Sequence, residues 1–178
     1  HNGAITSDLM DNFDAEAYVD TLARAHANRH TCFVKCHHGF VYYPTDAGTP
    51  HPYLKGDMFG GILAECNKRD IAAMAYPNVC RDGHPYDTNP DWRQCDRDGN
   101  GLFHRGIKYV CVNSPYGPEL LWPLIDETMD RYPSIKGFFF DGTLFYKGGC
   151  YCEYCQRKMA AEGVNANNAD ALNDFQVR

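Results

Sequence analysis

One apolar segment of the chain ends in a carboxylate: Ile135-Lys136-Gly137-Phe138-Phe139-Phe140-Asp141-Gly142. Its short aromatic run is bounded by turn residues, which predicts a β-strand over Ile135–Phe140. No polar residue interrupts the run after Gly137, so we expect both faces to be covered, as in a parallel sheet wrapped by helices. Catalytic residues gather at the carboxyl ends of such strands, so we predict that Asp141 is catalytic. The alternative is that Asp141 only caps the following loop.

Composition limits the classes of protein to consider. The chain has 178 residues, of which 44% are hydrophobic and 13% aromatic, so it can form a domain with a core. The net charge of −6 argues against a surface for nucleic acid or for an acidic membrane. No apolar stretch is as long as a membrane span, and no signal peptide is visible. We expect one domain over residues 1–178, favour a cytoplasmic location and leave secretion open.

Helical and strand patterns alternate along the chain. The predicted strands, besides the one before Asp141, are Thr31–Lys35, Asp70–Tyr76 and Ile107–Val112. Helices are predicted to open at Asp14 and to begin after the N-cap residue Asp57. Others are predicted at Leu121–Met129 with a late start or kink at Pro123, at Glu153–Glu162 and at Ala169–Val177. Strands that alternate with helices indicate βα units and a parallel sheet. Because a closed eight-stranded α/β barrel takes about 250 residues, the chain is either a smaller open sheet or part of a barrel.

Three cysteines stand close together in the sequence, at Cys150, Cys152 and Cys155. The chain has nine cysteines, an odd number, which favours metal binding and free thiols over a disulfide framework. Zinc prefers thiolates, and a structural zinc site needs four ligands. We choose Cys111 as the fourth, with Cys95 as runner-up, and expect a structural zinc because four cysteines leave no position for water. The alternative is a mixture of free thiols and an adventitious disulfide.

Two adjacent histidines, His37 and His38, directly follow the first predicted strand. Their neighbours include Gly39 and the aromatic pair Tyr42 and Tyr43, a combination that favours a sugar pocket over two structural histidines. A metalloenzyme using the histidines ranks low, because adjacent histidines lack the spacing that places two ligands on one helix face. The segment Arg81–Arg105 is a long polar loop, and loops of this length are usually functional. Trp92 within it is a candidate sugar platform or, equally, a cover for the sheet edge.

With these motifs in place, the chain resembles the domains called hypothetical glycosyl hydrolase 6. The resemblance covers roughly His30 to Gly163 and is fairly specific as an ordered set. Its motifs are Phe33–Phe40 with His37-His38-Gly39, Tyr42–Thr45, His51–Leu54, Cys111–Tyr116, Phe139–Gly142 and the Cys150–Cys155 cluster. The resemblance implies a (β/α)8 TIM-barrel type of α/β fold, of which this chain would cover about the first half.

Two better-known families share parts of this set. The retaining α-L-fucosidases are similar at His37-His38-Gly39, although they carry an extra Asp before the Gly, and at Phe139-Phe140-Asp141-Gly142, where their Asp is the nucleophile. The β-galactosidases with a trimerisation domain are similar at Cys111-x-Asn-Ser-Pro and at the three clustered cysteines, which bind zinc there. Those galactosidases place an acid/base Glu where this chain has Thr143, and this departure favours Asp141 as a nucleophile.

The resemblance therefore implies a retaining exo-glycosidase that acts on a carbohydrate. Asp141 would be the nucleophile, His37, His38, Tyr43 and Trp92 would bind the sugar, and Cys111, Cys150, Cys152 and Cys155 would hold zinc. An α-L-fucoside is the first substrate expectation and a galactoside the second; a non-catalytic carbohydrate-binding module is the competing class. The second carboxylate that a glycosidase needs is expected beyond residue 178, with Asp82, Asp87, Asp91 and Asp98 as alternatives. A homo-oligomer is possible.

Overall fold

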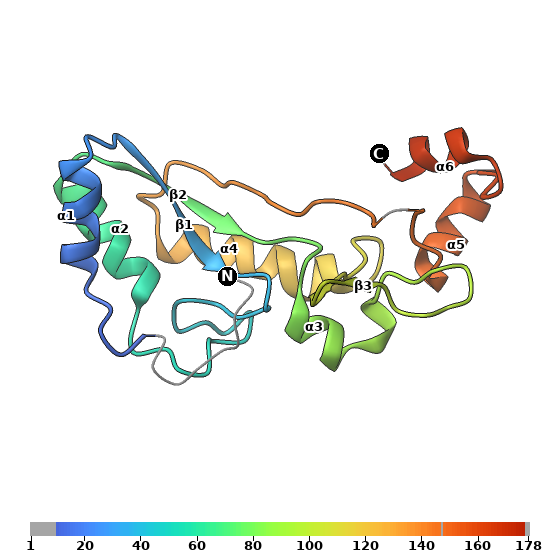
Figure 1. Cartoon of the computed structure of the whole chain (residues 1–178), viewed down its shortest axis with the longest axis horizontal. Helices are drawn as coiled ribbons and strands as arrows, with labels where there is room; N and C mark the ends of the chain where they lie inside the picture. The colour runs from blue at the N-terminus through green and yellow to red at the C-terminus, as the bar shows by residue number, and fades with distance from the viewer. Residues whose placement is uncertain (1–9, 147, 177–178) are drawn as a thin grey trace. The chain divides into compact units, whose positions relative to one another are not determined.

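The computed structural model describes residues 10–146 and 148–176, and its fold is of the α/β type (Figure 1). The chain divides into two compact units, which we describe separately. The first contains the described residues up to Cys36 together with Phe40–Pro77 and Trp122–Asp141. The second contains His37–Gly39, Asn78–Leu121 and the described residues from Gly142 onward.

A pair of parallel strands forms the centre of the first unit. Strand β1 (Arg29–Lys35) pairs with β2 (Ala72–Pro77), with Arg29 opposite Ala72 and Phe33 opposite Tyr76. Helix α2 (Met58–Lys68) connects the two strands, as parallel pairing requires. The predicted βα unit is therefore present, and both strands lie within two residues of their expected bounds.

Three helices flank this strand pair: α1 (Ala15–Arg24), α2 and α4 (Trp122–Arg131) (Figure 1). The Asp14 carboxylate accepts bonds from two first-turn amides of α1, and Asp57, the predicted N-cap, accepts one from the Gly60 amide of α2. The core residues come from every one of these elements. They include Val19, Val34, Phe59, Leu63, Cys66, Ala75 and Leu124.

The segment before Asp141 lies beside β2 but is not a regular strand. The Ala75 amide donates to the Gly137 carbonyl and the Phe139 amide donates to the Ala75 carbonyl, which leaves one isolated parallel bridge between Ala75 and Phe138. Gly137 has φ +148°, a conformation that interrupts an extended chain. The predicted strand Ile135–Phe140 is thus correct in place and direction but wrong in regularity.

The expectation that both faces of this segment are covered is also wrong. Phe139 is 50% and Phe140 48% exposed, and Phe33 on β1 is 47% exposed. On β1 the exposed Phe33 alternates with the buried Val34, because successive side chains of a strand point to opposite sides. Phe33 and Phe139 both pack on the Tyr76 ring, whereas Phe140 stacks on Phe138, which packs against the core.

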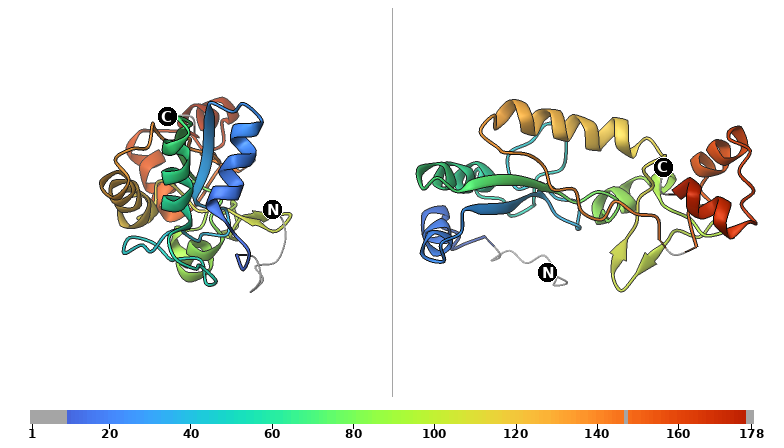
Figure 2. Two further views of the ribbon diagram at one scale, coloured as in Figure 1. Left: turned by 90° about the vertical axis from the view of Figure 1, so that its left-hand side faces the viewer. Right: turned by 90° about the horizontal axis from the view of Figure 1, so that it is seen from above.

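The second unit contains short elements within the segment predicted to be a long loop. Helix α3 spans Gly83–Thr88, and the 3-10 turn η1 spans Pro90–Trp92. Strands β3 (Phe103–His104) and β4 (Ile107–Lys108) form an antiparallel hairpin, visible in the right-hand view of Figure 2. The predicted strand Ile107–Val112 is therefore shorter than expected, because Tyr109 and Val110 form only isolated bridges to Arg81 and Arg93.

Two helices close the described chain, α5 (Glu153–Ala161) and α6 (Ala169–Gln176), as the sequence pattern predicts. Val177, the expected last residue of α6, lies outside the described residues. The late start predicted from Pro123 is present in α4. A π-helical turn, η2 (Gly117–Leu121), comes first, and the α-helix α4 begins only at Trp122. Within the described residues, no helix is both long and apolar enough to cross a membrane.

Candidate functional site

Four cysteine sulfurs converge in the second unit. The Sγ atoms of Cys111, Cys150, Cys152 and Cys155 all lie within 4.8 Å of one another, and all four residues are buried. The Sγ atoms of Cys111 and Cys155 are 3.4 Å apart. Around a tetrahedral zinc with Zn–S bonds of about 2.3 Å, neighbouring sulfurs lie about 3.8 Å apart. The cluster therefore has the donor type, donor number and spacing of a structural metal site.

Local structure explains how the cluster forms. Cys152 is the N-cap residue of α5, and Cys155 lies in its first turn. Cys111 follows Val110, whose amide donates to the Cys80 carbonyl at 2.8 Å. Hydrogen bonds among the four sulfurs lower the pKa of Cys152 and Cys155 and raise the pKa of Cys111 and Cys150. All nine cysteines are free, and Cys95, the runner-up ligand, lies beside the cluster but outside the set of four.

The candidate nucleophile Asp141 lies in the first unit, level with the carboxyl end of β2. Its amide approaches the Pro77 carbonyl, at 3.5 Å. The Tyr76 hydroxyl, from the penultimate residue of β2, donates to its carboxylate. The Tyr76 ring in turn packs between Phe33, with centroids 4.3 Å apart, and Phe139, at 5.5 Å. Sequence reasoning missed Tyr76, although its place at a strand end was a usable signal.

The candidate histidines belong to the second unit, where the backbone holds them. The amides of Gly83 and His84 donate to the carbonyls of His37 and His38, at 2.9 and 2.8 Å. The two rings lie 4.2 Å apart. Burial lowers the pKa of both histidines, and the neighbouring ring lowers that of His37 further. Both rings are therefore neutral near pH 7, the form that can donate and accept a hydrogen bond at once.

A buried polar pair lies behind this turn. Gly39 has φ +92°, and a Cβ there would come within 2.5 Å of the Asp82 carboxylate. Asp82 is fully buried and accepts a 2.7 Å bond from the hydroxyl of Tyr116, which also bonds the Val79 carbonyl. The position therefore requires glycine for both conformation and space. Asp82 was a candidate second carboxylate, but here it supports the histidine turn.

The other two predicted sugar contacts differ in exposure. Tyr43 is completely buried in the first unit, and its hydroxyl bonds Thr128 at 2.9 Å and Glu127 at 3.2 Å. This environment is that of a core residue, and it offers no surface to a ligand. Trp92 is half-buried in the second unit, with its ring edge-on to Tyr116 at 6.0 Å. Trp92 therefore keeps a face that a sugar could contact.

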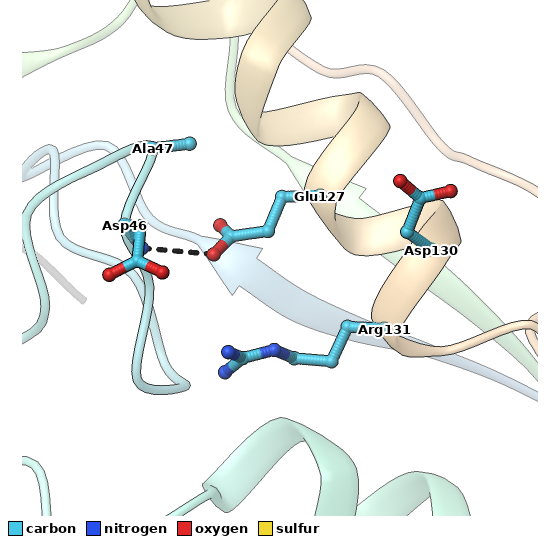
Figure 3. Close-up of a pocket in the computed structure, with 5 residues that line it drawn as sticks. All are labelled: Asp46, Ala47, Glu127, Asp130 and Arg131. Atoms are coloured by element: carbon cyan, nitrogen blue, oxygen red, sulfur yellow. Dashed lines mark hydrogen bonds between the residues drawn. The ribbon is translucent and has the colours of Figure 1, made fainter.

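A pocket in the first unit lies against α4 and contains none of the predicted site residues (Figure 3). It is lined by Asp46, Ala47, Glu127, Asp130 and Arg131. The Glu127 carboxylate accepts bonds from the Thr45 hydroxyl and from the Asp46 amide, the latter at 2.9 Å. These bonds attach the loop after β1 to α4, which gives the pocket walls a structural role.

Gln94 is a second residue that sequence reasoning missed. Its side chain is completely buried and donates to the carbonyls of Val110 and Leu144, at 3.0 and 2.9 Å. Its amide oxygen accepts from the Tyr146 amide at 2.9 Å. Gln94 thus ties the loop that follows Asp141 to the chain that leads to Cys111. A polar residue in an irregular segment carries no sequence signal for this role.

The chain is similar in structure to several glycosidases. An α-L-fucosidase, isoenzyme 2 from Paenibacillus thiaminolyticus, matches with a TM-score of 0.81 and 27% identity over 94% of this chain and 26% of that one. A GH29 α-L-fucosidase from Bacteroides thetaiotaomicron matches with a TM-score of 0.55 and 21% identity, over 93% of this chain and 32% of that one. A β-galactosidase from Rahnella sp. R3 matches with a TM-score of 0.64 and 18% identity, over 94% and 24%.

These comparisons also limit what the chain represents. It spans about a quarter to a third of the length of these enzymes. No curated protein matches it. The family model of hypothetical glycosyl hydrolase 6 matches residues 14–165, which is most of the sequence. The chain therefore belongs to the hypothetical glycosyl hydrolase 6 family.

Proposed function

We propose that this chain is part of a retaining glycosidase of the α-L-fucosidase type, with Asp141 as its nucleophile. The observation that carries the proposal is the carboxylate of Asp141 at the carboxyl end of β2, hydrogen-bonded by Tyr76, in a chain similar to α-L-fucosidases. Parallel α/β enzymes place their chemistry at that end of the sheet. The fold would be the first half of a (β/α)8 barrel, with residues 1–178 acting as one domain.

The proposed chemistry follows from the carboxylate. Asp141 attacks the anomeric carbon, the bond to the leaving group breaks, and a glycosyl-enzyme ester forms that water then hydrolyses. The Tyr76 hydroxyl bond orients the attacking oxygens. Neutral His37 and His38 would each bond a sugar hydroxyl as donor or acceptor. Trp92 would contact an apolar sugar face, whereas we give the buried Tyr43 no sugar contact.

The second carboxylate must protonate the leaving group. In a retaining enzyme the two carboxyl groups lie roughly 5 Å apart. Among the candidates in this chain, Asp82 is buried beside Tyr116 and Asp87 pairs with Lys108. We therefore propose that the acid/base is supplied from outside these 178 residues. This proposal agrees with the quarter to a third of each matched enzyme that the chain spans.

We further propose that Cys111, Cys150, Cys152 and Cys155 hold one structural zinc ion. Their spacing supports this, since all four sulfurs lie within 4.8 Å of one another. The bound metal would supply cross-linking, because four thiolates leave no position for a substrate. It would join Cys111, in the chain after β4, to the start of α5. It would also hold the loop after Asp141, which Gln94 binds through Leu144 and Tyr146.

An aryl-glycoside screen tests the proposed activity on the longest natural form of the polypeptide. We expect hydrolysis of an α-L-fucoside, and loss of at least about a thousandfold in kcat with Asp141→Asn, because the amide is no nucleophile. Asp130→Asn, a surface carboxylate in the same unit, is the control and should keep full activity. A mutant at Asp141 that stays as active as wild type would remove this residue from the mechanism.

The same screen separates the alternatives. Preferred turnover of a β-galactoside would favour the galactosidase type, to which the structural similarity also extends. Sugar binding without turnover of any aryl glycoside by the longest form would favour a carbohydrate-binding module. Calorimetric titration with fucose and galactose distinguishes these outcomes from a protein that binds no sugar.

A further inference from the structure

A side chain outside the four cysteines bonds one of the clustered sulfurs. The Asn113 amide nitrogen lies 3.3 Å from the Sγ atom of Cys155 and donates to it. The carbonyl oxygen of the same side chain accepts from the Lys158 ammonium group, also at 3.3 Å. A chain of two hydrogen bonds therefore runs from a surface cation through a half-buried amide to a buried sulfur.

The negative charge of a metal-bound cluster explains what these two hydrogen bonds would do. A zinc ion with four thiolates carries a net charge of −2, and a buried charge is costly unless polar groups compensate it. The surroundings are largely apolar: Met159, Leu172 and Phe175 pack around the sulfurs. A donor aimed at a charged sulfur is worth more than one aimed at a neutral thiol, so the Asn113 bond strengthens when metal is bound.

Lys158 is held for this role by two elements. It belongs to α5, three residues after Cys155, and its ammonium group also lies 5.6 Å from the ring centroid of Phe175 on α6. The Phe175 contact restrains a long side chain that would otherwise sample many rotamers. Lys158 polarises the Asn113 amide, and because it is exposed its own effect is screened by water and salt.

The Cys-x-Asn-Ser-Pro motif places the amide correctly. The Ser114 hydroxyl donates to the Cys111 carbonyl at 2.6 Å, and the Ser114 amide donates to the same carbonyl at 3.1 Å. This tight turn brings Asn113 back toward the cluster that Cys111 enters. The turn explains why an asparagine two residues after one ligand reaches the sulfur of another.

We propose that Asn113, polarised by Lys158, is a positioning residue of the metal site: it compensates the charge on the Cys155 sulfur and so sets the affinity for zinc. The inference rests on the zinc site proposed above. Hydrogen-bonding partners of metal ligands typically change metal affinity by about 10- to 100-fold. We expect a loss in that range for Asn113→Ala, a larger loss for Asn113→Asp, and a smaller one, which disappears at high salt, for Lys158→Gln.

The test measures zinc affinity on purified protein by competition with a chromophoric chelator at fixed pH and two salt concentrations. Asn89→Ala removes an amide from the same unit that bonds Pro85 and Thr88 among the described residues, and is the matched control for Asn113. Arg157→Gln removes a positive charge from the same helix and is the control for Lys158. Both controls should bind zinc as wild type does.

Cobalt substitution gives a readout that a general loss of stability would not produce. Removing the donor from the Cys155 sulfur should shift the thiolate-to-cobalt charge-transfer band, while the Asn89→Ala band stays in place. Zinc affinity of Asn113→Ala within twofold of wild type, with an unshifted band, would overturn the inference. A wild-type protein that binds no zinc would instead overturn the metal site itself, so the two failures are distinguishable.

Discussion

The first unit buries Val34, Phe59 and Leu63 between two parallel strands and the helices that flank them, whereas half of the core residues around Cys111 in the second unit are cysteines. Four of the eight buried residues in that second core are the clustered cysteines. The strands of the second unit are two residues long, and α3 has six residues. Regular elements bury enough apolar surface to hold the first unit together, but irregular segments with a small core need a cross-link.

The largest effect should come from breaking the proposed zinc cross-link with Cys152→Ser. We expect loss of zinc and destabilisation by several kcal/mol, since loss of a structural metal is among the severe mutational mechanisms. Elemental analysis and the melting temperature measure the two effects. Hydrogen exchange should show lost protection in α5 and unchanged protection in α2.

Cys66→Ser is the control for this experiment. Cys66 is equally buried but lies on α2 in the first unit, so the variant should keep its zinc. Two findings would contradict the account of the second unit: carefully purified wild type without zinc, or a bonded Cys150–Cys155 disulfide.

A substitution in the apolar core should have the next largest effect and spare the metal. Leu63 is 4% exposed in the first unit, so Leu63→Ala should cost about 2–5 kcal/mol through lost burial and the cavity left behind. Denaturant unfolding measures this cost. Met129→Ala, at a position 46% exposed on α4, should change stability far less. Zinc loss from Leu63→Ala would show that the two units do not differ as we argue.

Removing one buried hydroxyl from the second unit should cost less. Tyr116→Phe removes the hydroxyl whose single proton is shared between the Asp82 carboxylate and the Val79 carbonyl, at a cost of about 1–3 kcal/mol. Because Asp82 lies against Gly39, the variant should also weaken sugar binding at the histidine turn while zinc stays bound. Tyr154→Phe serves as the control. A Tyr116→Phe protein as stable as wild type would show that the buried Asp82–Tyr116 hydrogen bond does not stabilise the second unit.

The smallest effect should come from the N-cap of α1. Asp14→Ala removes the acceptor for the Glu16 and Ala17 amides and should cost about 1 kcal/mol. Asp14→Asn keeps an oxygen acceptor, so the melting temperature should return close to that of wild type. Equal losses for both variants would indicate that charge, and not capping, stabilises this helix end.

Local signals predicted much of the fold. Asp14 and Asp57 mark helix starts through a side-chain bond to nearby amides, and the buried stripe of α2 follows from helical spacing alone. The cysteine cluster was predictable because three of its cysteines lie within six residues. The fourth member of the cluster, Cys111, was predicted from its place near the end of the apolar run at 107–112.

Other features depend on distant contacts and could not be predicted. The irregularity at Gly137 and the exposure of Phe139 depend on which elements cover the sheet, and Tyr43 is buried because α4 supplies Thr128 and Glu127. Tyr76 is 65 residues from Asp141 in sequence, so only the pairing of the segments brings them together.

Trapping the glycosyl-enzyme tests the assignment of Asp141 most directly. The longest natural polypeptide would be incubated with 2-deoxy-2-fluoro-α-L-fucosyl fluoride, and the labelled peptide identified by mass spectrometry. We predict one fluorofucosyl group on Asp141, and none on the Asp141→Asn variant. A label on another carboxylate, or turnover of α-L-fucosides with no covalent label at Asp141, would contradict the account.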